Sequence, residues 1–97
     1  MNSITYQRNE LIAPLGRYFQ VSFMPHGVGY TWDVGYIGGF VVSMSRLREA
    51  AADKASVPVR NVSLRRTLLL PTGVEYVVRH VDGNILGTLY VDLKEQG

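Results

Sequence analysis

The sequence predicts an α+β fold: a mostly antiparallel, curled sheet of about five strands with one helix packed on one face. Three observations predict this class. Apolar residues alternate with polar ones over 17–23, which is the period-2 pattern of a half-buried strand. Good helix formers fill 46–55 and end before Pro58, which cannot continue a helix. Turn signals separate apolar strands in the last third, so the predicted order is β-β-α-β-β-β.

The amino-terminal third is patterned unevenly. Residues 1–15 are expected to form a loosely ordered arm or a short edge strand, with Ile4 and Tyr6 on one side. A strand from Arg17 follows, and the turn 24–27 is expected to connect it to a second strand over 28–37. Gly38 and Gly39 are expected to bend this second strand before 40–42 continue it.

Capping residues and turn residues predict the helix and the last three strands. Ser43 or Ser45 can accept from the free amides of a helix over 46–55. Strands are expected over 59–70, 74–81 and 85–93. A two-residue loop at Asp82-Gly83 would pair Val74 with Val91 and His80 with Ile85, whereas a three-residue loop would exchange the sides of one strand.

Length and composition limit the function. Ninety-seven residues make one domain over 1–97, and a formal net charge of +2 lacks the dense basic character of a phosphate-binding chain. The absence of cysteine excludes disulfides and thiol chemistry, which favours the cytoplasm as the compartment. The longest uncharged stretch, 34–45, is about half of the ~20 residues that span a bilayer, so no membrane association is expected.

The residues available for acid–base chemistry are few. His26 and His80 are the only histidines, and neither belongs to a motif with metal-ligand spacing. We therefore expect no metal and no cofactor, and the sequence favours a protein that is not an enzyme. The alternative is a small-ligand or catalytic pocket between the sheet and the helix, with His26 or His80 as its polar group.

An aromatic row is the most informative functional signal. Tyr30, Trp32 and Tyr36 would share one face of the second strand, where large amphipathic rings can form an interaction surface. Arg66 and Arg79 would supply a charged rim. The leading hypothesis is a non-enzymatic protein-interaction module of the adaptor, regulator or inhibitor type, which binds a protein partner, itself as a homodimer, or both.

Two further observations bear on this hypothesis. One helix of three turns cannot cover five strands, so the sheet either curls into a partial barrel or meets a second subunit. The polar side of the last hairpin is mixed enough to face water or a partner. Its members are Glu75, Val77, Arg79, Leu86, Thr88 and Tyr90.

The alternative partner is nucleic acid. Arg60, Arg65 and Arg66 form the main basic cluster, which could bind phosphates beside the same aromatic residues. Neighbouring residues of a strand point to opposite faces, so Arg65 and Arg66 would not share one flat surface.

Overall fold

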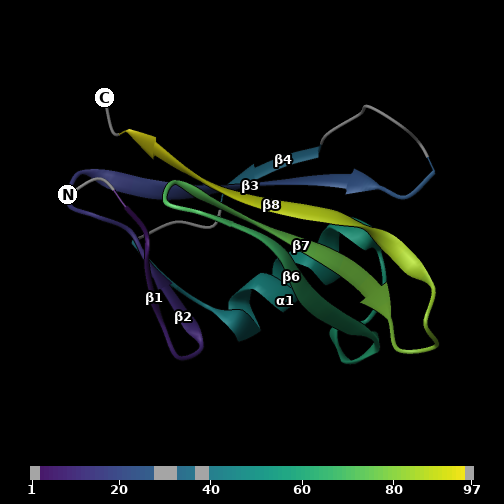
Figure 1. Cartoon of the computed structure of the whole chain (residues 1–97). Coiled ribbons are helices and arrows are strands. Elements are labelled where there is room, and N and C mark those ends of the chain that lie inside the picture. The colour runs from purple at the N-terminus through teal and green to yellow at the C-terminus, as the bar shows by residue number, and fades with distance from the viewer. Residues whose placement is uncertain (1–2, 28–32, 37–39, 96–97) are drawn as a thin grey trace.

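The chain is an α+β protein of two antiparallel sheets and one helix in this computed structural model, which describes residues 3–27, 33–36 and 40–95 (Figure 1). The predicted fold class is confirmed. The elements in chain order are β1 (Thr5–Gln7), β2 (Glu10–Ile12), β3 (Arg17–Pro25), β4 (Asp33–Tyr36), β5 (Val41–Ser43), α1 (Met44–Ala55), the 3-10 helix η1 (Val59–Asn61), β6 (Val62–Leu70), β7 (Gly73–His80) and β8 (Ile85–Glu95).

Five strands form the main sheet, in the order β4-β3-β8-β7-β6, and the sheet does not close into a barrel. Strands β3 and β4 pair as predicted, from Gln20↔Tyr36 to Phe23↔Asp33. The expected turn at 24–27 is wrong, because β3 continues to Pro25 and Phe23 pairs with Asp33 instead of residue 28. The expected strand over 59–70 begins later, at Val62, because residues 59–61 form η1.

A second sheet of three strands, β1-β2-β5, was not expected. Residues 3–15 contribute a hairpin whose Leu11 pairs with Val42, and both side chains are buried. Residues 40–42 therefore do not extend the strand before them, because β5 pairs in this small sheet. Strands of three residues are too short to show an alternating pattern, which explains why the sequence did not reveal them.

The β7–β8 hairpin corrects the predicted turn. His80 N–H donates to Asn84 O at 2.8 Å, and Gly83 N–H donates to His80 O at 2.9 Å, so the loop has three residues, 81–83. Gly83 has a φ of 101°, a conformation that favours glycine. His80 therefore does not pair with Ile85. A bulge at Leu86 restores the register, so the expected pairs Val78↔Gly87, Tyr76↔Leu89 and Val74↔Val91 form nevertheless.

The helix packs on one side of the main sheet, which we call the inner face. Ser43 Oγ accepts from Arg46 N–H at 3.1 Å, so the N-cap is one of the two predicted. Leu47 and Ala51 are fully buried beneath the sheet. No helix in the described part of the chain is long and apolar enough to cross a membrane. The buried inner-face residues are Phe19, Val21, Phe23, Val74, Tyr76, Val78, Leu89, Val91 and Leu93.

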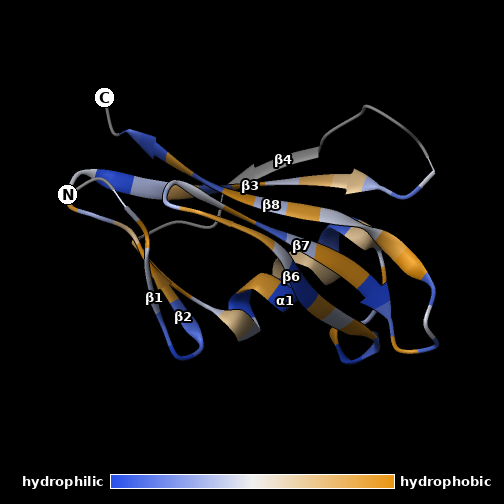
Figure 2. Cartoon of the chain, in the orientation of Figure 1, coloured by the Kyte–Doolittle hydropathy of each residue, from blue (hydrophilic) through white to orange (hydrophobic). Residues whose placement is uncertain are grey.

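The opposite side of the main sheet is the outer face. Figure 2 shows apolar and polar residues alternating along these strands, as the period of a strand requires. Both α1 and the small sheet contribute to the core with the inner face, so they lie on that side. The outer face includes the positions of Gln20, Ser22, Met24, Arg65, Glu75, Val77, Arg79, Ile85, Thr88, Tyr90 and Asp92.

Candidate interaction face

The centre of the outer face is a half-buried row that no described element covers. Register places Val77 beside Thr88, and Thr88 beside Met24 on β3. All three are partly exposed, so their burial comes from neighbours within the sheet. This row mixes apolar and hydroxyl groups, which is the composition of a surface that meets either water or another protein.

The hydroxyl end of the Tyr90 ring lies over a glycine on this face. Gly73 lies diagonally across from it on β7, and a Cβ at that position would overlap the Tyr90 hydroxyl and come within 2.9 Å of its Cζ. The absence of a side chain at Gly73 therefore makes room for the ring. Tyr90 thus presents a half-buried aromatic surface with a polar end.

Acidic groups surround Tyr90. Burial raises the pKa of its hydroxyl, and the Asp92 and Glu75 carboxylates raise it further, while Lys94 lowers it. Lys94 Nζ lies 3.1 Å from Asp92 Oδ2 in an ion pair. Tyr90 therefore remains a neutral hydrogen-bond donor at physiological pH.

Glu75 is positioned by the edge strand β6. A bulge between Arg66 and Leu68 leaves Thr67 unpaired with β7, and its hydroxyl lies 3.1 Å from Glu75 Oε1. This bond holds the carboxylate at the β6 side of the outer face. Glu75 makes no ion pair within the described residues.

Arg79 and Ile85 lie on the other side of the Val77–Thr88 row. They are partners in the β7–β8 register, and both are exposed, Ile85 to 40%. Arg79 makes no ion pair with any residue that the structure describes. The outer face therefore carries an acidic end and a basic end on either side of its central row.

The predicted aromatic row lies mostly outside the described residues. Tyr30 and Trp32 belong to the undescribed segment 28–32. Tyr36 is the last residue of β4, and its register position is opposite Gln20.

The candidate arginines are divided between the two faces. Arg65 pairs with Val77 on the outer face, whereas Arg66 pairs with Tyr76 on the inner face, as the strand period predicts. Arg66 Cζ lies 5.9 Å from the centre of the Tyr6 ring, a cation–π distance. Arg79 shares the outer face with Arg65, so Arg66 and Arg79 do not form one rim. Arg60 lies in η1, outside the main sheet.

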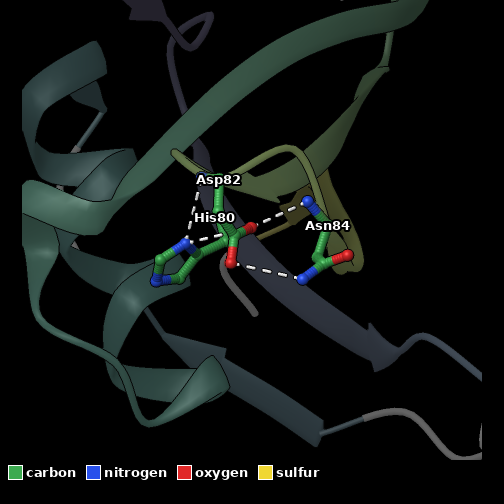
Figure 3. A network of polar contacts seen from close by, with 3 residues as sticks. All are labelled: His80, Asp82 and Asn84. Carbon is green, nitrogen blue, oxygen red and sulfur yellow. Dashed lines mark hydrogen bonds and ion pairs between the residues drawn. The ribbon is translucent and has the colours of Figure 1, made fainter.

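His80 belongs to a turn network (Figure 3). The Asp82 carboxylate accepts from the backbone N–H of Asn84 at 2.9 Å and from its side-chain amide at 3.2 Å. His80 Nδ1 accepts from Asp82 N–H at 3.2 Å and, when protonated, can pair with Asp82 Oδ1 at the same distance. These contacts within 80–84 close the hairpin, which gives His80 a structural role.

His26 lines a hollow of about 300 Å³ with Met24, Pro25, Gly27 and Thr88. Met24 and Thr88 are outer-face residues, so this hollow does not lie between the sheet and the helix. His26 is exposed, and its backbone N–H donates to Leu86 O at 3.0 Å. Across residues 3–27, 33–36 and 40–95, no group of three or more His, Asp or Glu side chains is placed to hold a metal ion.

Comparison of the chain with protein-family models, with curated proteins and with solved structures finds no match. The sequence identified the mixed character of this face, apart from Leu86, which the bulge leaves packed against the core. The sequence did not predict the seating of Tyr90 over Gly73 or the Thr67–Glu75 contact, because both depend on register and on a bulge.

Proposed function

We propose that this protein is a non-enzymatic interaction module that binds a protein partner through the outer face of the main sheet. The observation that carries the proposal is the half-buried row of Val77, Thr88 and Met24, flanked by Tyr90, on a face that no described element covers. An aromatic anchor within a partly apolar centre and a polar rim is the usual anatomy of a protein interface.

The seating of Tyr90 favours binding. Its ring lies over Gly73 in the free chain, so it is already on the outer face, and a Tyr side chain has few torsions to lose when a partner covers it. Its neutral hydroxyl can donate to an acceptor on the partner. This ring is an aromatic anchor on the outer face in addition to the predicted Tyr30, Trp32 and Tyr36.

The charges of the outer face favour a protein over a nucleic acid. Glu75 and Asp92 share this face with Arg65 and Arg79, and the two carboxylates would repel phosphates. Proteins match mixed charges readily, since both signs occur on their own surfaces.

Site-specific photocrosslinking tests the proposal. A benzoylphenylalanine at position 88 probes the centre of the outer face, and the same group at position 53, an exposed site on α1, is the matched control. We expect a protein adduct in cells from position 88 and not from position 53. Excess unlabelled protein should compete the adduct away, whereas an equally stable Val77→Arg variant should not.

Two outcomes would contradict the proposal. One is a yield of protein adduct at position 88 no higher than at position 53. The other is a crosslink at position 88 that is mainly to nucleic acid and disappears in high salt, which would support the arginine cluster instead.

A further inference from the structure

We propose that the partner on the outer face is a second copy of this chain, related by a two-fold axis that runs across the strands through Val77 and Thr88. This inference rests on the proposed function and names its partner. The two main sheets would stack face to face, as sheets do in β-sandwiches.

The charges on β7 are arranged for this symmetry. Glu75, Val77 and Arg79 share the outer face, with about 6.6 Å between successive positions along the strand. A two-fold axis through Val77 exchanges the positions of the two charged residues. Glu75 then faces the partner's Arg79, and Arg79 faces the partner's Glu75, so one arrangement makes two ion pairs.

Both charged groups are available for such a contact. Arg79 is exposed and has no ion pair within the described residues. The Glu75 carboxylate accepts from Thr67 at one oxygen, Oε1, which leaves lone pairs for a guanidinium. The Thr67 contact also restricts the carboxylate, so its position is set before association.

The apolar residues on β8 follow the same symmetry. Tyr90 and Ile85 lie on opposite sides of Thr88, so the axis places each against the other in the partner. The bulge at Leu86 contributes directly, because it brings Ile85 opposite Arg79 on the outer face. Ile85, 40% exposed in the single chain, would be covered by an aromatic ring.

The charges also select between possible axes. A two-fold axis parallel to the strands, between β7 and β8, would place Glu75 against the partner's Tyr90 and Arg79 against the partner's Ile85. That arrangement pairs no opposite charges. The axis across the strands is therefore favoured over the axis along them.

The area of the outer face is close to that of a standard dimer interface. Four strands at about 4.8 Å spacing and about 30 Å of strand length give a flat area of about 600 Å² per copy. A standard interface buries about 800 Å² per partner. Side chains that project from the sheet add surface to this flat area and bring the buried area close to that value. Arg65 would lie near the Arg65 side chain of the second copy. It is on the edge strand β6, however, and the twist of the two sheets increases the distance between their faces at the edge.

Charge reversal tests this axis. Sedimentation equilibrium of the purified full chain gives the dimer dissociation constant for the wild type, Glu75→Arg, Arg79→Glu and the double variant. Each single variant should weaken the dimer by about tenfold or more, because it places like charges together. The double variant restores opposite charges in both pairs, so its Kd should return to within about threefold of the wild type.

Matched controls separate folding from association. Thr67→Ala removes the hydroxyl that positions Glu75 without changing charge, so it should weaken the dimer by much less than either charge reversal. Arg65→Ala should tighten the dimer, because it removes the approach of the two Arg65 side chains to each other. The midpoints of urea denaturation identify any variant that fails to fold. If Glu75→Arg does not fold, Glu75→Gln replaces it, because glutamine keeps an acceptor for Thr67. Glu75→Gln should still weaken the dimer.

The outcomes that overturn the inference are distinct from those that overturn the proposed function. A wild-type chain that stays monomeric at about 100 μM, well above the Kd range of specific complexes, rules out the second copy as partner. So does a dimer that the two single charge reversals leave unchanged. In either case the crosslink from position 88 still decides whether the outer face binds another protein.

Discussion

The two faces of the main sheet carry the same local pair, an aromatic ring seated over a glycine on the neighbouring strand, in different surroundings. On the inner face Phe23 covers Gly87, and on the outer face Tyr90 covers Gly73. Phe23 is 1% exposed beneath the helix layer, whereas Tyr90 stays half-buried with a hydroxyl at its end. The sheet therefore uses the same ring-over-glycine contact both to fill the core and to form an exposed surface.

The largest expected effect is on the inner face. Phe23→Ala should lower the free energy of unfolding by about 3–5 kcal/mol, because it leaves a cavity over Gly87. Tyr90→Ala should cost clearly less, since solvent can enter the space. Urea denaturation of both variants measures the difference, and equal losses would contradict the distinction between the two faces.

The glycines give the next largest effect. Gly87→Ala overlaps the Met24 carbonyl as well as the Phe23 ring, whereas Gly73→Ala overlaps mainly the Tyr90 side chain. We expect Gly73→Ala to destabilise by about 1–3 kcal/mol and Gly87→Ala by more, because backbone yields less than a ring.

A double-mutant cycle checks the outer pair. In a Tyr90→Ala background, the cost of Gly73→Ala should fall to less than half. An unchanged cost would mean that Gly73 is required for its backbone and not for the space above it.

A smaller effect is expected away from both faces, at the start of α1. Ser43→Ala removes the hydroxyl that accepts from Arg46 N–H and should cost about 1 kcal/mol. Ser45→Ala, the other predicted cap, is the control and should be nearly neutral. Thermal or urea unfolding distinguishes them, and a larger loss at Ser45 would contradict the observed cap.

The smallest effect is pH-dependent and lies in the β7–β8 turn. The backbone N–H of Asn84 holds the pKa of Asp82 below its ordinary value of 3.8, and His80 lowers it further. Because the folded chain favours the carboxylate, this contribution to stability is complete above pH 3.8 and is lost as pH falls through the lowered pKa. Carbon-13 NMR titration should show the lowered pKa, and Asp82→Asn should remove this part of the acid sensitivity.

Much of the main sheet was predictable because its strands are long and their apolar and polar residues alternate. The buried set Phe19, Val21 and Phe23 follows from period 2 alone. The small sheet was not predictable, since its strands have three residues and pair across 30 positions of chain. The predicted pairs from Val78↔Gly87 to Val74↔Val91 were correct although the predicted turn and the His80–Ile85 pair were wrong, because the longer loop and the bulge at Leu86 offset each other.

The candidate site was predictable only in part. Alternation placed Glu75, Val77, Arg79 and Tyr90 on one face, and it separated Arg65 from Arg66. Alternation could not show that Thr67 reaches Glu75, since that contact depends on an irregular position in β6. It also could not relate Glu75 to Arg79, because their complementarity appears only when a second copy is considered.

Hydroxyl-radical footprinting of the wild-type chain at rising concentration tests most directly whether the outer face meets a second copy. Met24 and Tyr90 on this face should become less oxidised as concentration increases, while exposed Phe40 in the same samples should not change. Protection confined to the outer face is the predicted result. Oxidation of Met24 and Tyr90 that is independent of concentration, up to about 100 μM, would contradict the account.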